Sequence, residues 1–123
     1  RAKCFSEDRP VESWPDSDEV PPRCPRCGGL LRPDVVWFGE MLPASTLHAA
    51  EHAALTADIF FSIGTSALVY PAADLPFSAL AAGVTVVEIN PQPTPLSPHV
   101  TFSLHGAAGA VLPALVARVW EAG

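Results

Sequence analysis

The sequence predicts an α/β protein, a parallel sheet with helices on both faces, joined to a small cysteine-bearing module. Two observations predict the sheet. Nearly continuous apolar runs, typical of strands buried on both faces, recur between residues 58 and 104, and Ala-rich helical segments separate them. A third observation marks the module, because residues 1–34 hold all three Cys and many Pro. We therefore divide the chain into a module of residues 1–34 and a sheet domain of residues 35–123.

The elements of the sheet domain follow in order. Residues 35–38 form a short β-branched and aromatic run (Val-Val-Trp-Phe) that ends at Gly39, which predicts a strand. Residues 43–57 are rich in Ala and begin with Pro, which favours the first turn of a helix. By the same criteria we expect strands over 58–63, 84–90 and 100–104, and helices over 71–82 and 109–120.

Composition excludes several classes of function. The 123 residues include 7 Lys and Arg against 13 Asp and Glu, a net charge of −6, so we expect no nucleic-acid partner. No run of about 18 apolar residues occurs, so we expect no membrane span. Three Cys cannot form a full disulfide framework and no signal-peptide pattern is present, which favours the cytoplasm. The first residue is Arg1 rather than Met, so we expect a piece of a longer protein.

The cysteines predict a zinc site with an incomplete ligand set. Cys24 and Cys27 form a C-x-x-C pair followed by Gly, a spacing that lets two thiolates bind one tetrahedral ion. Cys4 lies twenty positions before that pair, and the position where a second C-x-x-C would end holds Glu7. A carboxylate binds zinc, although structural sites prefer Cys and His. The alternative is a degenerate motif with weak metal binding or none.

Two strand ends carry polar residues that suit a nucleotide. Gly64, Thr65 and Ser66 follow the strand expected at 58–63, and their amides and hydroxyls suit ribose and phosphate oxygens. Asn90 closes the strand expected at 84–90, where ribose hydroxyls are usually bound. The alternatives are a turn that caps the next helix and an Asn-Pro turn. No Gly-x-Gly-x-x-Gly fingerprint occurs in the chain.

A third motif is rejected as a site. His48, Glu51 and His52 match the H-x-x-E-H pattern of some metallopeptidases, and positions i and i+4 share one face of a helix. Short patterns of this kind arise easily by chance. The same residues are equally explained as the solvated face of an Ala-rich helix.

The order and spacing of these motifs resemble the sirtuins, of the bacterial and mitochondrial class III type. The resemblance is carried by the Cys24–Gly29 segment, by residues 32–40 (Arg-Pro-Asp-Val-Val-Trp-Phe-Gly-Glu), by residues 64–66 and by Glu88-Ile89-Asn90. It covers nearly the whole chain. It implies a Rossmann-like, doubly wound parallel sheet that is incomplete here, together with part of a zinc-binding module.

The resemblance also implies a chemistry. Sirtuins use NAD to remove acyl groups from protein lysines, giving nicotinamide and O-acyl-ADP-ribose, and their cofactors are NAD and zinc. Acylated-lysine proteins would be the partners. The implied residues are three metal ligands (Cys4, Cys24, Cys27), a substrate-peptide edge (Val36, Trp37, Phe38, Gly39, Glu40) and NAD contacts (Gly64, Thr65, Ser66, Asn90, Pro91, Gln92, Ala108).

The catalytic base of the family has no counterpart in this sequence. In sirtuins a His-Gly pair precedes the first zinc Cys, and no such pair precedes Cys4. The Gly-Ala-Gly-rich NAD loop of the family is missing as well. We therefore assign no catalytic residue and expect this polypeptide alone to be inactive, because no side chain accepts the ribose proton. The alternative function is a non-catalytic nucleotide- or peptide-binding module.

Overall fold

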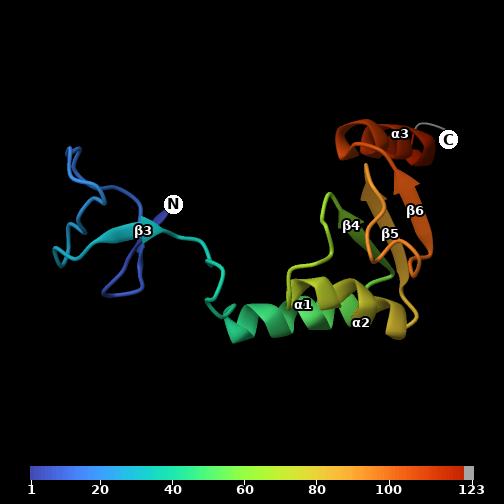
Figure 1. Cartoon of the computed structure of the whole chain (residues 1–123), viewed down its shortest axis with the longest axis horizontal. Helices are drawn as coiled ribbons and strands as arrows, with labels where there is room; N and C mark the ends of the chain where they lie inside the picture. Colours follow the sequence, from blue (N-terminus) through green and yellow to red (C-terminus); the bar gives the residue numbers. More distant parts are fainter. Residues whose placement is uncertain (121–123) are drawn as a thin grey trace. The chain divides into compact units, whose positions relative to one another are not determined.

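The computed structural model describes residues 1–120, which form two compact units, Arg1–Leu42 and the described part of Pro43–Gly123 (Figure 1). Each unit has its own sheet and its own buried core. The division after residue 34, which was drawn from composition, stays a prediction. Within residues 1–120, no helix has the length and apolar character needed to cross a bilayer.

The first unit is built on a small antiparallel sheet that sequence analysis did not predict. Its strands are β1 (Ala2–Cys4), β2 (Pro10–Val11) and β3 (Leu31–Pro33), in the order β2-β1-β3. Strands of two or three residues are too short to show an alternating pattern. The core of this unit is small and includes two of the three cysteines: Cys4, Val11, Cys24 and Leu31.

The strand predicted over residues 35–38 is absent, so that prediction was wrong. The segment bends instead, and the Glu40 amide donates to the Trp37 carbonyl at 3.0 Å. Gly39 takes a positive φ of 88°, a conformation that glycine adopts without a steric penalty. The run is apolar, but no neighbouring strand pairs with it in the described chain. Local hydrogen bonds therefore set its conformation.

The second unit holds the parallel sheet that the sequence predicts. Its strands are β4 (Ile59–Ile63), β5 (Thr85–Asn90) and β6 (Phe102–His105), in the order β4-β5-β6. Both pairings are parallel, with Ile63 opposite Ile89 and Asn90 opposite His105. All three strands therefore end at one edge of the sheet, and β4 is an outer strand.

Helices lie on both sides of this sheet, as predicted (Figure 1). They are α1 (Ala44–Thr56), the short 3-10 helix η1 (Ala72–Asp74), α2 (Leu75–Ala81) and α3 (Ala108–Trp120). The strands lie between the α1–α2 pair and α3. The small side chains of Ala54 on α1 and Ala79 on α2 pack with Val86 of β5, so helices and sheet approach closely.

The α3 side of the sheet is packed less tightly. A cavity of about 630 Å³ lies there, and apolar side chains of all three strands and of α3 line it. No described residue of α3 is fully buried. The sheet therefore has one well-packed face and one that is only partly covered.

Candidate functional site

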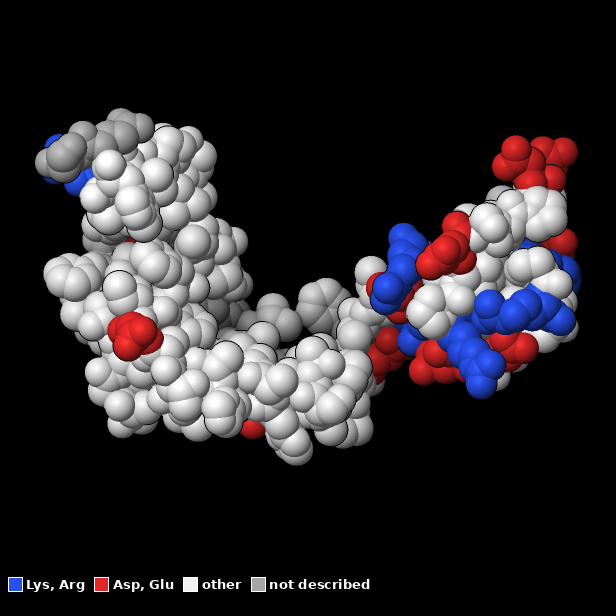
Figure 2. All heavy atoms as spheres, turned by 180° about the vertical axis from the view of Figure 1, so that it is seen from behind, with Lys and Arg blue, Asp and Glu red and all other residues white. Residues whose placement is uncertain are grey.

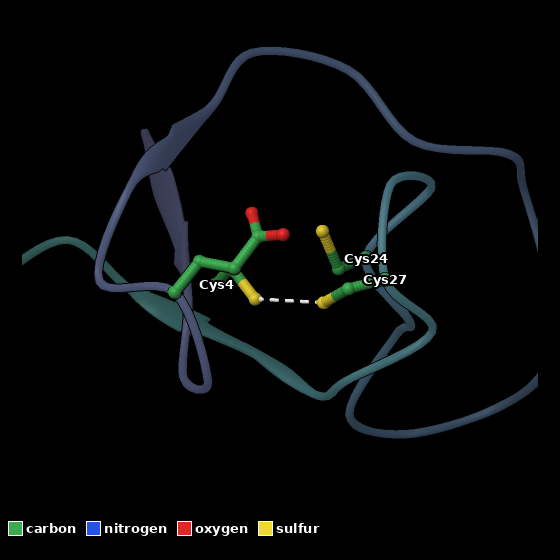
Figure 3. A group of neighbouring side chains, drawn as sticks. Cys4, Cys24 and Cys27 are labelled. Atoms are coloured by element: carbon green, nitrogen blue, oxygen red, sulfur yellow. Dashed lines mark hydrogen bonds between the residues drawn. The ribbon is translucent and has the colours of Figure 1, made fainter.

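The three thiols that the sequence places far apart meet in the first unit (Figure 3). The Sγ atoms of Cys4 and Cys27 lie 3.4 Å apart. One ligand atom each from Cys4, Glu7, Cys24 and Cys27 lies within 4.8 Å of the others. Cys4 and Cys24 are buried and Cys27 is exposed. Zn²⁺ binds thiolates and carboxylates in tetrahedral sites of this size, so the cluster fits a zinc site.

The Cys24–Gly29 turn positions two of these thiols. The Gly28 amide donates to the Cys24 carbonyl at 2.9 Å, and the Cys24 amide donates to the Gly29 carbonyl at 2.7 Å. Gly28 takes a positive φ of 73°, which closes the turn. A Cβ at Gly29 would lie 2.6 Å from Ser6 Oγ and 3.3 Å from Cys27 Sγ, so a larger residue there would displace the Ser6 side chain. The Gly-Gly pair after Cys27 thus holds the loop against its neighbour.

The local hydrogen bonds separate the acidities of the C-x-x-C thiols. Burial raises the pKa of Cys24, but hydrogen bonds from the Arg26 and Cys27 amides and from the Cys4 and Cys27 thiols together leave that pKa below its ordinary value. The Gly29 amide lowers the pKa of Cys27, yet the adjacent Cys4 thiol and burial raise it to about 11. Cys24 is therefore the more readily ionised thiol of the pair.

Arg32 contacts two residues of the segment predicted as the peptide edge, Trp37 and Glu40. The Arg32 guanidinium donates to both carboxylate oxygens of Glu40, at 2.5 and 2.9 Å, and lies 3.9 Å from the centre of the Trp37 ring. The Trp37 amide also donates to Glu40, at 3.0 Å. These hydrogen bonds lower the pKa of Glu40 to about 2, and the one from Arg32 has the largest effect. Phe38 stands out from this frame and is 93% exposed.

The carboxyl ends of β4, β5 and β6 bring the predicted nucleotide residues to one edge. The Gly64 amide donates to the Ile89 carbonyl at 2.9 Å, and the Gly106 amide donates to the Asn90 carbonyl at 3.1 Å. The residues after β4 and β6 therefore flank the end of β5. Gly64 has a positive φ of 63°. A cavity of about 270 Å³ beside β4 includes Thr65 in its lining.

Two polar side chains at this edge make local hydrogen bonds. The Thr65 hydroxyl accepts from the Ala67 amide at 3.2 Å, and the Asn90 amide nitrogen donates to the Gln92 carbonyl at 2.9 Å. Thr65 caps no helix, since η1 begins only at Ala72. Pro91 and Gln92 form a bend after β5, and the Asn-Pro turn weighed as the alternative at Asn90 stays a prediction. Among the other predicted NAD contacts, Ser66, Pro91 and Gln92 lie in the two loops, and Ala108 begins α3.

A buried carboxylate behind this edge was missed by sequence reasoning. Glu88, only 2% exposed, accepts hydrogen bonds from the hydroxyls of Thr94, Ser97 and Ser103. Two of these hydroxyls lie in the loop after β5, so Glu88 ties that loop to the sheet. The signal was an acid inside an apolar strand, followed by hydroxyl residues.

The H-x-x-E-H motif does not form a metal cluster. Its residues lie on α1, as predicted. Among residues 1–120, the Cys4, Glu7, Cys24 and Cys27 group alone brings three or more ligand atoms together. The rejection of a metallopeptidase site stays a prediction.

Comparisons with known proteins agree with the motifs. A family model described as "Sir2 family" matches residues 2–71. The chain is 48% identical to NAD-dependent protein deacylase 2 of Pyrobaculum aerophilum over 125 residues, which cover 97% of the chain and 48% of that protein. It is 46% identical to the NAD-dependent protein deacylase of Mycobacterium tuberculosis over 121 residues, covering 96% of the chain and 51% of that protein.

Solved structures give the same assignment. A Sir2 homologue in complex with NAD matches with a TM-score of 0.88 and 46% identity, over 98% of this chain and 48% of that one. A Sir2–p53 peptide–NAD⁺ complex matches with a TM-score of 0.83 and 25% identity, over 99% of this chain and 52% of that one. The chain spans about half the length of the curated relatives it matches. On the family match and these identities, the chain belongs to the Sir2 family.

Proposed function

We propose that this chain is part of an NAD-dependent protein-lysine deacylase, and that it supplies the zinc module, one edge for the acylated peptide and part of the NAD site. The observation that carries the proposal is the near-complete coverage of the chain by deacylases at 46–48% identity. The structures of Sir2 homologues with NAD and with a p53 peptide support the same two ligands here.

The NAD contacts would come from Gly64, Thr65, Ser66, Asn90, Pro91, Gln92 and Ala108. The positions of Gly64 and Asn90 at one sheet edge support this assignment, because ligands of parallel sheets bind where strands end. NAD would supply the ribose carbon that the acyl oxygen attacks and nicotinamide as the leaving group. We assign no catalytic residue to this chain.

Charge restricts how a pyrophosphate is held here. Arg118 is the only Lys or Arg in residues 43–123, and the view in Figure 2 shows most of the charged atoms gathered on the other unit. Phosphate oxygens that contact this unit would therefore be bound by neutral donors, the backbone amides and hydroxyls of the loop after β4. Glycine at position 64 lets the backbone come close to such a ligand.

The peptide edge would be formed by Val36, Trp37, Phe38, Gly39 and Glu40. An added strand binds through backbone hydrogen bonds and imposes little sequence specificity. The Arg32–Glu40 pair supports this role, because it restrains the segment while the Phe38 side chain stays exposed. Cys4, Cys24 and Cys27 would hold a structural zinc that ties β1 to the Cys24–Gly29 turn.

The test is a deacylation assay on the full-length gene product with an acetyl-lysine peptide. We expect nicotinamide release that requires NAD, and about a tenfold rise in the KM for NAD on Asn90→Ala, the loss of roughly one hydrogen bond. An Asp58→Asn change at an exposed position of the same unit should leave the kinetics unchanged. Saturable ADP-ribose binding without turnover would instead identify a non-catalytic nucleotide-binding module.

We also propose that the protein is cytoplasmic. All three cysteines are free, and their convergence on one site suits a reduced compartment. Fluorescence microscopy of a tagged full-length protein in its own host tests this placement.

A further inference from the structure

We propose that Glu7 is the fourth ligand of the metal site, so that the module binds zinc through three thiolates and one carboxylate, and that Arg26 positions this carboxylate. The proposal rests on metal binding by the three cysteines, proposed above. It assigns a ligand role to residue 7, where the sequence has Glu instead of the Cys that would complete a second C-x-x-C pair.

The backbone around Glu7 repeats the turn around Cys27. In residues 4–9 the amide of the fifth residue donates to the first carbonyl at 2.9 Å, and the first amide donates to the sixth carbonyl at 2.9 Å. Residues 24–29 make the same two bonds, at 2.9 and 2.7 Å. The fifth residue has a positive φ in both turns, 51° at Asp8 and 73° at Gly28. The two turns therefore match, and Glu7 occupies the position that Cys27 holds in its own turn.

The first turn adopts this conformation at a cost in backbone strain. Asp8 takes the left-handed conformation that Gly28 takes freely, and a residue with a Cβ is less stable there by about 1–2 kcal/mol. The first turn is tied to the segment after the second turn, because the Phe5 amide donates to the Leu30 carbonyl at 2.9 Å. The chain thus keeps the ligand-bearing conformation although the ligand differs.

The Glu7 carboxylate faces the thiols and is held in place. One of its oxygens lies within 4.8 Å of the three sulfurs. Arg26, from the second turn, donates through Nε to Glu7 Oε2 at 3.0 Å and through its terminal nitrogen to the Pro10 carbonyl at 3.4 Å. Carboxylates that bind metals are commonly hydrogen-bonded in this way, which fixes their orientation. Arg26 also offsets the negative charge of a site with four anionic ligands.

The neighbouring carboxylate does not compete for this role. Asp8 forms an ion pair with Lys3, at 2.6 Å, and it does not belong to the group of converging ligand atoms. It is exposed and adjacent to Glu7 in sequence. Asp8→Asn is therefore a matched control, because Asn tolerates a positive φ and the change removes one acid from the same turn.

The experiment uses the whole 123-residue chain, loaded with Co²⁺ for absorption spectra and with Zn²⁺ for affinity by chelator competition. We expect one metal per chain and a thiolate-to-cobalt absorption that fits three thiolates. Arg26→Met should weaken zinc binding about tenfold, within the range of 10- to 100-fold seen when groups that hold metal ligands are removed. Glu7→Gln, which removes a ligand itself, should weaken zinc binding by more than Arg26→Met does. Asp8→Asn should leave affinity and spectrum unchanged.

Glu7→Cys tests whether residue 7 reaches the metal even if Glu7→Gln fails to fold. It should add a fourth thiolate, raise the thiolate-to-cobalt absorption by about one third and shift the cobalt ligand-field bands, as expected when four thiolates replace three. The same spectrum in wild type, Glu7→Gln and Glu7→Cys would overturn the role of Glu7 while leaving a three-cysteine site in place. No metal uptake by the wild-type chain would overturn both that site and this proposal.

Discussion

Replacing Glu88 with Gln should selectively loosen the loop that follows β5. Glu88 is 2% exposed, and the Ser97 hydroxyl donates to its Oε2 at 2.5 Å. The Thr94 and Ser97 hydroxyls have little freedom to turn round, because their oxygens already accept from the backbone amides of Leu96 and Thr94. A Gln side chain puts an NH₂ donor where the carboxylate accepts, so one hydroxyl hydrogen loses its acceptor.

The expected loss is about 1–3 kcal/mol, the penalty for leaving a buried polar group unsatisfied. The measurement is hydrogen exchange of the Thr94 and Leu96 amides, whose protection should fall about 5- to 140-fold, since 1.4 kcal/mol is a factor of ten. Asp58→Asn, which replaces an exposed acid in the same unit, is the control and should leave the protection of both amides unchanged. Ser103→Ala should have the smallest effect of the three hydroxyl deletions, because its hydrogen bond is longest, at 3.2 Å. Unchanged protection in Glu88→Gln would refute the reasoning.

Four further predictions concern the other features. Arg32→Gln should raise the pKa of Glu40 from about 2 toward its ordinary 4.5, seen by carbon NMR of the side-chain carboxyl; a value that stays near 2 would show that Arg32 is not the cause. In the wild type, Glu40 stabilises the fold above pH 4.5, and this contribution is lost as the pH falls toward 2, which acid unfolding monitored by circular dichroism checks against Arg32→Gln. Zinc removal by a chelator should unfold the Arg1–Leu42 unit first, detected by amide exchange of β1 and β3, whereas equal loss in β5 would contradict a metal confined to that unit. The 123-residue polypeptide alone should give no nicotinamide from NAD and an acetyl-lysine peptide, and turnover above background would show that a base is present after all.

The second unit could be predicted from sequence because its pattern is strong. Its strands 59–63 and 85–90 are apolar for five or six residues, long enough to show a period, and Ala-rich segments lie between them. The carboxyl edge with Gly64 and Asn90 follows from that topology alone. The hydrogen bonds of Glu88 were harder to predict, because its partners are hydroxyls up to fifteen positions away in sequence. The conformation of the loop after β5 decides whether two of these hydroxyls reach the carboxylate.

The first unit could not be predicted in the same way. Its strands are two or three residues long, and its core is held by cysteines rather than by a periodic apolar face. The segment 35–38 has strand composition without a strand partner in the described chain, and the Arg32–Glu40 pair bends it. Composition indicates what a segment favours, but a strand also needs a neighbour.

The outer position of β4 has a practical consequence for work with this polypeptide. β4 pairs with β5 on one side only, and Ile59, Phe61 and Ile63 are each more than a third exposed. A row of unpaired amides and carbonyls along an outer strand is a template for strands of other chains. Concentrated samples should therefore self-associate through this strand, and a lysine in place of Phe61 is the simplest way to keep them monodisperse.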